Sequence, residues 1–237
     1  MKISRKILII LIGSIIVLVG GVFMIIHQHK PNPIKTVYLT FDDGPSIYTE
    51  DLLDILKERN LPAIFFIMGE SIDVTPNSHD IIKRIFAENH HLGLHSMTHQ
   101  QEKLYSRDNS PQLFVDEMLE LRNLLGEILG GYETNLCRAP FGVWLFNKKH
   151  WKAVKKAGLH CLEWNINSRD WELQSADEIF EQIVKEAEDL KFPNKVVILF
   201  HENDRTVEVL PKAIDYFQEK GYNFVPYLEG NIKLLSK

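Results

Sequence analysis

The sequence has little of what would mark a disulfide-stapled or a nucleic-acid-binding protein. Only two of its 237 residues are cysteines, Cys137 and Cys161, which is too few for a disulfide framework. They could pair in an oxidising environment, but two buried thiols are the interpretation we prefer. The chain also lacks an excess of positive charge: its formal net charge of −5 argues against binding to nucleic-acid phosphates. No internal repeat or low-complexity tract is present, and the 45% apolar content is enough for a folded core.

Acidic residues are absent from the first 35 positions, which contain a long apolar segment, Ile7–Ile26. Twenty helical residues at about 1.5 Å each span roughly the 30 Å of a bilayer's hydrocarbon core. Lys2, Arg5 and Lys6 precede the segment, which predicts a cytoplasmic N-terminus and an extracellular remainder. A cleaved signal peptide is the alternative, but its apolar region is usually shorter, about 7–15 residues.

This distribution predicts a single-pass plasma-membrane protein. The expected parts are a basic cytoplasmic segment at 1–6, a transmembrane signal-anchor at 7–26, a short stalk at 27–35, one folded domain at 36–230 and a C-terminal tail at 231–237.

Beyond residue 35, apolar β-branched runs alternate with stretches of helical periodicity. The predicted strands are 36–41, 63–68, 91–95, 135–138, 159–166, 195–200 and 223–227, and the predicted helices are 50–60, 80–88, 110–128, 147–158, 175–190 and 207–220. Repeated βα units predict a parallel sheet, and periodicity does not distinguish an open sheet from a closed barrel. In a barrel, side chains at the carboxyl ends of the strands would converge on one site. Polar residues do follow the predicted strands here: Asp42, Asp43, His95, Arg138, Asp170 and His201.

Four residues at or just after the strand ends are of the types that bind a divalent metal ion: Asp42, Asp43, His95 and His99. Asp42 and Asp43 are adjacent carboxylates before a Gly-Pro turn, although a capping turn explains such a pair equally well. His95 and His99 are four residues apart, so on a helical turn both rings would face the same way. Two imidazoles suit a cation of the zinc type, and an aspartate would supply a third ligand.

The remaining three residues suggest charge pairing. Arg138 stands beside a Pro-Phe-Gly turn, where a buried guanidinium could bind a carboxylate. Asp170 and His201 could form a dyad of the kind that orients a histidine for proton transfer. Each residue alone is more often structural than catalytic.

Together, five segments carry a family resemblance, in the order Thr40–Pro45, His95–His99, Arg138–Gly142, Asp170–Trp171 and Leu199–His201. They resemble the five motifs of the polysaccharide deacetylases, the NodB-homology domain of carbohydrate esterase family 4, over about residues 35–229. The subgroup that looks most similar is the membrane-anchored peptidoglycan N-acetylglucosamine deacetylases of Gram-positive bacteria. The resemblance implies an α/β fold, a distorted parallel (β/α) barrel of about seven strands, preceded here by one transmembrane helix.

The resemblance also implies a hydrolase that removes acetyl groups from N-acetylglucosamine units with one divalent metal ion, usually Zn²⁺, with Co²⁺ or Mn²⁺ as alternatives. Asp43, His95 and His99 match the metal ligands of the family. Asp42 matches its general base, and Arg138 matches the residue that orients this base.

The second half of the matched set implies the rest of the reaction. His201 matches the general acid, and Asp170 matches the carboxylate that holds it. Phe141 occupies the position whose backbone N–H helps to bind the oxyanion, and Trp171 and Leu199 match the apolar wall around the acetyl methyl group.

Three departures from the family pattern concern substrate preference more than the metal site. Ala139 stands where a second proline is usual, Leu94 replaces a common asparagine, and Asn165 and Asn167 stand where aspartate is frequent.

A polysaccharide and the membrane are the expected partners, with no nucleic acid and no evident protein partner. The alternatives are a deacetylase of chitooligosaccharide or of an acetylated exopolysaccharide and, in a different class, an inactive membrane-tethered glycan-binding module.

Overall fold

The computed structural model describes residues 34–228 of the chain. The predicted cytoplasmic segment and signal-anchor, nearly all of the stalk and the C-terminal tail lie outside these residues. Within the described range, no helix is long and apolar enough to cross a membrane.

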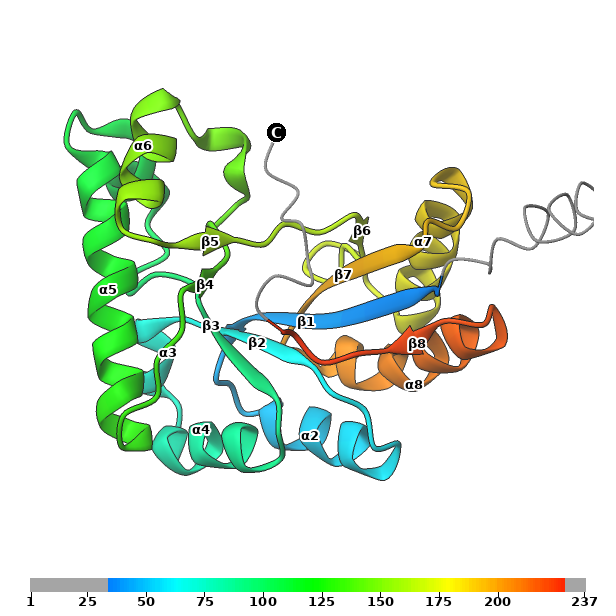
Figure 1. Ribbon diagram of the computed structural model, residues 1–237. Coiled ribbons are helices and arrows are strands. Elements are labelled where there is room, and N and C mark those ends of the chain that lie inside the picture. The colour runs from blue at the N-terminus through cyan, green and yellow to red at the C-terminus, as the bar shows by residue number, and fades with distance from the viewer. Residues whose placement is uncertain (1–33, 229–237) are drawn as a thin grey trace, which may run out of the picture. The chain divides into compact units, whose positions relative to one another are not determined.

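The described chain forms one parallel sheet, shown in Figure 1, with the strand order β5-β4-β3-β2-β1-β7-β6 and a short eighth strand, β8, paired with β1. The strands are β1 (Thr36–Gly44), β2 (Ile64–Ile67), β3 (His91–Leu94), β4 (Leu136–Cys137), β5 (His160–Cys161), β6 (Ile166–Asn167), β7 (Lys195–His201) and β8 (Asn223–Phe224). All ladders are parallel, and the predicted parallel βα sheet is confirmed.

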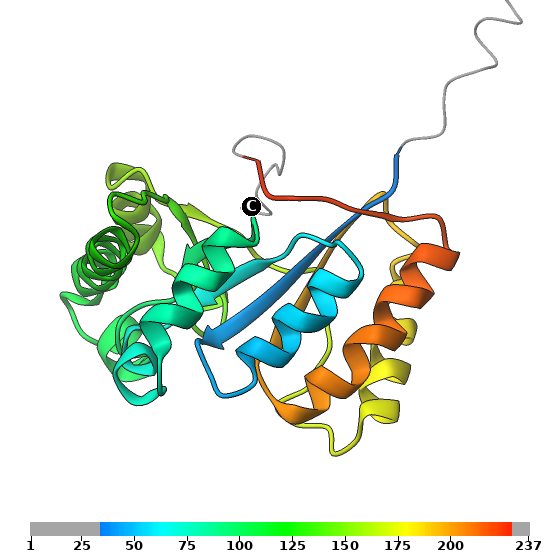
Figure 2. The same cartoon turned by 90° about the horizontal axis from the view of Figure 1, so that it is seen from below.

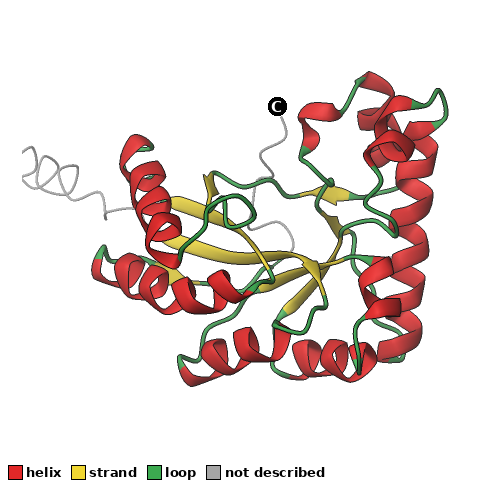
Figure 3. Ribbon diagram, turned by 180° about the vertical axis from the view of Figure 1, so that it is seen from behind, coloured by secondary structure: helices red, strands yellow, loops and turns green. Residues whose placement is uncertain are grey.

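Helices run around the outside of this curled sheet (Figure 3). They are α2 (Thr49–Glu58), α3 (Gly69–Val74), α4 (Ser78–Ala87), α5 (Ser110–Leu129), α6 (Lys148–Lys156), α7 (Ala176–Asp189) and α8 (Asp204–Glu219), with single turns η1 (Glu102–Ser106) and η2 (Val143–Leu145). Figure 2 shows α4, α2 and α8 side by side below the strands. The long helices contact one another in the order α6-α5-α4-α2-α8-α7, which follows the order of the strands.

The two faces of the sheet bury different side chains. On the face toward the helices, Phe41 stacks between Phe65 and Phe200, with ring centroids 5.0 and 5.8 Å apart. On the inner face, a second apolar cluster contains Tyr38 and Phe66. Because side chains alternate along a strand, β1 presents Tyr38, Thr40 and Asp42 to the same inner face. On the inner face of β1, the Asp42 carboxylate therefore follows after apolar side chains.

One predicted strand is wrong. The run 159–166 was expected to form a single strand, but it forms β5 and β6, which lie at opposite edges of the row. The segment crosses the open side of the sheet, and Leu162 fills its interior on the way. No ladder joins β5 to β6 within residues 34–228, so the described sheet is a curled, incomplete barrel.

The sequence also predicts N-caps at Ser110, Asn147 and Ser175; two of these predictions are confirmed, and one is wrong. Asn147 caps α6, and Ser175 forms a capping box at the start of α7. Ser110 is not the cap of α5: it is the first helical residue, and Asn109 precedes it. The Ser110 hydroxyl instead lies 3.3 Å from Nε2 of His150, because α6 packs against this end of α5.

Candidate active site

The two aspartates lie on the last residues of β1, not in a turn after it. The ladder with β2 shifts between Asp42 and Gly44, and Asp43 has a left-handed backbone with φ of 69°. On a regular strand, consecutive side chains point to opposite faces, whereas this irregularity turns both carboxylates toward one site. A methyl group on Gly44 would lie 1.9 Å from Oε1 of Glu202, so a larger residue next to the pair would have to displace that carboxyl group.

His95 and His99 come from the loop after β3. The expected helical turn is wrong, because residues 95–99 form an irregular loop with positive φ at Ser96 (68°) and His99 (52°). Their Nε2 atoms nevertheless lie 3.3 and 3.5 Å from Oδ1 of Asp43. One ligand atom from each of the three side chains lies within 4.8 Å of the others. The loop therefore achieves by backbone conformation what a helical turn would have achieved by spacing.

The chemistry of this cluster fits a divalent metal ion. Oδ1 of Asp43 is buried and has no hydrogen-bond partner among residues 34–228, an arrangement that is costly without a ligand. Nδ1 of His95 lies 2.9 Å from the carbonyl oxygen of Arg138. A carbonyl only accepts, so Nδ1 carries the hydrogen and Nε2 keeps a free lone pair. Two imidazoles and one carboxylate form the three-ligand set of catalytic zinc sites.

The charges around Asp43 favour its ionised form. Burial alone would raise the pKa of Asp43, but the surrounding histidines hold that pKa well below its usual range. Burial likewise acts to lower the pKa of His95, while the negative charges of Asp42 and Asp43 raise it on balance.

Asp42 has a different set of partners. Its Oδ1 accepts a hydrogen bond of 2.8 Å from Nη1 of Arg138, while its Oδ2 lies 3.8 Å from Nε2 of His95. Arg138 is fully buried and also donates to Thr40 and to the carbonyl of Leu162. A buried carboxylate needs such a partner, since an unpaired charge would be strongly destabilising there. Arg138 therefore fixes one oxygen of Asp42 and leaves the other facing the cluster.

His201, at the end of β7, is held by Asp170. Its Nδ1 lies 2.8 Å from Oδ1 of Asp170, and its backbone N–H donates to Oδ2 at 2.6 Å. Asp170 is fully buried and also accepts from Thr206. Burial lowers the pKa of His201, but the hydrogen bond and charge of Asp170 outweigh this and raise the pKa to about 9. Nε2 of His201 lies 4.0 Å from Oδ2 of Asp43.

Apolar side chains border the cluster. The Phe141 ring lies 4.5 Å from that of His99, and the backbone N–H of Phe141, at φ of 64°, has no acceptor within residues 34–228. The Trp171 ring stands edge-on to His201 at 5.2 Å. Leu199 is buried two residues before His201 and faces the same side of β7. The fold thus brings all ten residues of the expected site to the same end of the sheet.

Three glutamates near the site, of which Glu117 and Glu202 are buried and Glu163 is half-buried, were not identified from the sequence. Glu117 on α5 accepts from the backbone N–H groups of Met97 and Thr98 in the histidine loop. Glu202 accepts from Ser46, and burial raises its pKa to about 7. Glu163 accepts from Val143, and burial raises its pKa as well. Only Glu117 has a sequence signal, since it interrupts the apolar stripe of its helix.

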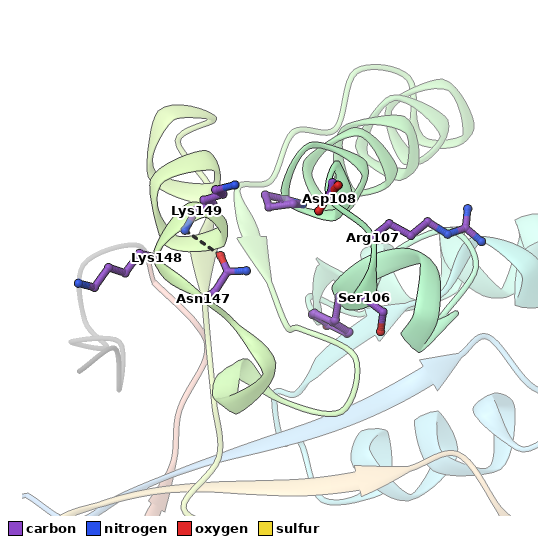
Figure 4. A pocket seen from close by; sticks show the side chains of 8 residues that line it. Ser106, Arg107, Asp108, Asn147, Lys148 and Lys149 are labelled. Atoms are coloured by element: carbon purple, nitrogen blue, oxygen red, sulfur yellow. Dashed lines mark hydrogen bonds between the residues drawn. The ribbon is translucent and has the colours of Figure 1, made fainter.

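A separate cavity of about 430 Å³ lies between the beginnings of α5 and α6 (Figure 4). It is lined by basic and polar side chains, including Arg107, Lys148 and Lys149, and by none of the residues of the candidate site.

Comparison with known proteins assigns the family. The polysaccharide deacetylase family profile matches residues 29–162. The chain is 36% identical to the putative polysaccharide deacetylase YheN of Bacillus subtilis, covering 80% of this chain and 66% of that protein, just under two thirds. It is 34% identical to a peptidoglycan-N-acetylglucosamine deacetylase of Bacillus cereus (82% and 70% covered) and 30% identical to a chitooligosaccharide deacetylase of a Bradyrhizobium species (81% and 89%).

The crystal structure of the polysaccharide deacetylase Bc1974 from Bacillus cereus is similar as well, with a TM-score of 0.72, 34% identity and coverage of 84% of this chain and 94% of that one. The fold is thus that of a parallel α/β domain of the polysaccharide deacetylase type. The chain belongs to the polysaccharide deacetylase family.

Proposed function

We propose that this protein is a metal-dependent N-deacetylase that releases acetate from N-acetylglucosamine residues of a cell-wall polysaccharide, with peptidoglycan as the first candidate substrate. One observation carries the proposal. A buried carboxylate oxygen without a hydrogen-bond partner among residues 34–228, Oδ1 of Asp43, lies between two histidines, and an Asp42–Arg138 pair and a His201–Asp170 pair flank it.

Asp43, His95 and His99 would hold the ion, for which Zn²⁺ is the best candidate and Co²⁺ or Mn²⁺ are alternatives. When bound, such an ion acidifies water and polarises the acetamide carbonyl.

The protein's own groups account for the proton transfers. Arg138 occupies Oδ1 of Asp42, so Oδ2 is the oxygen that accepts the proton of the attacking water as general base. His201, orientated through Nδ1 by Asp170, donates a proton from Nε2 to the departing amine. The Phe141 N–H has no acceptor in the described part of the chain and donates to the developing oxyanion. Trp171 and Leu199 enclose the acetyl methyl group.

The test is acetate release by protein from residue 36 onward, on acetylated peptidoglycan and on chitooligosaccharides, with and without a chelator. We expect release from peptidoglycan, its loss with the chelator and its recovery with added Zn²⁺. Greater release from chitooligosaccharides would favour the second candidate, which the similarity to the Bradyrhizobium chitooligosaccharide deacetylase supports. Absence of release from both would favour the inactive glycan-binding module, which the complete set of site residues argues against.

We also propose that residues 7–26 anchor the protein in the plasma membrane with the catalytic domain outside. The apolar length of the segment and the basic residues before it support this. Protease added to intact cells should then remove the domain while leaving a membrane-bound N-terminal fragment. Release of the whole protein into the medium would contradict the anchor.

A further inference from the structure

An exposed tryptophan stands next to the candidate site without a role in the reaction described above. Trp144 lies in η2, three residues after Phe141, and 75% of its surface is exposed. Leaving so large an apolar side chain in water forgoes the stabilisation that burial would give. An exposed aromatic group of this kind is informative where it adjoins a functional site.

The indole is fixed along one edge. Its Nε1–H donates to the carbonyl of Phe141 at 2.5 Å, and a methyl group on Gly142 would lie 3.0 Å from Cδ1 of Trp144. Both atoms belong to the five-membered ring, so the pyrrole edge lies against the loop and the six-membered ring projects outward. The polar atom of the side chain is satisfied within the protein, and what remains free is apolar.

The loop that carries Trp144 is itself held at several points. The Tyr105 hydroxyl donates to the Pro140 carbonyl at 2.7 Å, and the Val143 N–H donates to Glu163 at 3.2 Å. The Phe146 N–H closes the turn on Val143 at 2.9 Å. A rigid aromatic group loses little conformational entropy when a ligand packs on it.

Trp144 also adjoins the catalytic centre through Phe141. The Phe141 ring lies against His99, and the Phe141 carbonyl receives the indole N–H. A second exposed aromatic residue, Trp171, is half exposed beside His201. A glycan whose acetamide lies at the metal cluster would therefore meet Trp144 with the neighbouring part of its chain.

We propose that Trp144 is the platform of a second sugar-binding subsite, on which the pyranose ring next to the deacetylated N-acetylglucosamine stacks. A β-linked pyranose presents an apolar face of C–H groups, which an aromatic face binds without needing hydrogen bonds. The inference rests on the proposed function and deepens it, because such a subsite makes the enzyme select a glycan chain over a single sugar.

The test compares KM and kcat of the wild type, Trp144→Ala and Trp144→Phe on N-acetylglucosamine oligomers of increasing length. For Trp144→Ala we expect KM on the pentasaccharide to rise about tenfold with kcat nearly unchanged, a loss of about 1.4 kcal/mol of binding. The monosaccharide should show no change, and Trp144→Phe, which keeps an aromatic face, should be intermediate. Phe86→Ala is the matched control, because it removes an exposed aromatic side chain from α4, outside the site.

A binding measurement separates this inference from the proposed function. Calorimetric titration of the pentasaccharide into Asp42→Asn, with and without Trp144→Ala, does not depend on turnover, and we expect affinity to fall about tenfold with the second change. Equal affinities would overturn the subsite. So would an equal loss of kcat on the monosaccharide and the pentasaccharide, because Trp144 would then only support Phe141. A wild type that binds through Trp144 but releases no acetate would instead refute the deacetylase.

Discussion

Asp42 and Asp43 are neighbours with the same functional group, and their partners assign them different chemistry. Asp42 accepts a hydrogen bond on one oxygen from a buried guanidinium, whereas Asp43 faces two imidazoles, and its Oδ1 has no hydrogen-bond partner within residues 34–228. Two carboxylates in one pocket repel each other, and the arginine beside Asp42 and the histidines around Asp43 offset this repulsion. The left-handed backbone at Asp43 is the local conformation that makes this division geometrically possible.

Replacing the general base should therefore have a different effect from replacing a metal ligand. We expect Asp42→Asn to retain the metal ion, because Asp43 and the histidines are untouched, and to lose about 10²–10⁴-fold in kcat, the usual loss for a general base. Metal content by atomic absorption and acetate release check this. His99→Ala should lose metal and activity together. Loss of metal from Asp42→Asn would mean that the two roles are reversed.

The pairing of Asp170 with His201 predicts a pH dependence. Burial acts to lower the pKa of His201, but the hydrogen bond and charge of Asp170 outweigh burial and raise this pKa to about 9. His201 must be protonated to act as an acid. Activity should therefore fall as pH rises through this pKa. Asp170→Asn removes the main raising influence, so the alkaline limb of the kcat profile should move to lower pH, with metal content unchanged. An alkaline limb that stays in place would show that Asp170 does not tune His201.

At this scale the sequence identified the residues but not their geometry. The ordered motifs were enough to single out Asp43, His95 and His99. Their assembly depends on positive φ angles at Asp43, Ser96 and His99, which non-glycine residues adopt only where surrounding contacts impose them. Those contacts come from elements distant in sequence, so no local pattern could show them.

At the scale of elements, α5 acts on the metal cluster through the loop between β3 and η1. The Glu117 carboxylate is buried under this loop, where it accepts from Met97 N–H at 3.1 Å and from Thr98 N–H at 3.0 Å. It also accepts from the Thr98 hydroxyl, and Lys103 balances its charge at 2.7 Å. Both histidines lie on the segment that this one side chain holds.

Glu117→Gln should therefore weaken metal binding without removing any ligand. The glutamine amide keeps the shape of the Glu117 side chain but loses its negative charge and one hydrogen-bond acceptor. Loss of a contact that supports metal ligands without binding the metal typically lowers metal affinity by about 10–100-fold. Competition with a chromophoric chelator measures the affinity independently of activity. Glu120→Gln, an exposed change on the same helix, is the control and should match the wild type. Equal affinity in all three proteins would mean that the loop needs no support from α5.

The elements that could be predicted are those with a local signal. Capping residues marked α6 and α7 because a cap is satisfied within a few residues of its own chain. The run 159–166 was predicted wrongly because its apolar residues belong to two short edge strands and to the interior between them. The polar residues scattered among them do not mark where one strand ends and the next begins. The short helix α3 has too few residues for a periodic pattern to appear.

At the scale of the whole molecule, the parallel order was predictable, and the opening of the sheet was not. Alternating units and buried strands such as β7 predict parallel strands with helices outside. Whether the sheet closes depends on the pairing of β5 with β6, each only two residues long. Whether two such short strands pair depends on how the whole chain packs, not on their own sequences.

Glu202 connects two of the turns at the site end of the sheet. It lies between β7 and α8, accepts from the backbone of Ser46 between β1 and α2, and is also hydrogen-bonded to Thr49. Its Oε1 faces Gly44 and is buried without a partner within residues 34–228. A buried carboxyl group in this position is stabilised as the neutral acid.

This placement predicts how the stability of the whole domain depends on pH. Burial raises the pKa of Glu202 from 4.5 to about 7, with the charge of Asp43 adding to it and hydrogen bonds from Thr49 and Ser46 opposing it. Between these values the folded state keeps a proton that the unfolded state has released. The free energy of unfolding should therefore fall as pH rises across this window, by up to about 3 kcal/mol from this group. Glu202→Gln cannot ionise and should lack this loss.

Urea unfolding of the chelator-treated protein at about pH 4.5 and about pH 8 measures the difference. We expect the decline in unfolding free energy to be larger for the wild type than for Glu202→Gln, by up to about 3 kcal/mol. Glu208→Gln, an exposed change on the adjacent helix, should decline as the wild type does. Parallel declines in all three proteins would show that Glu202 is ionised throughout, and that the contacts from Ser46 and Thr49 outweigh its burial.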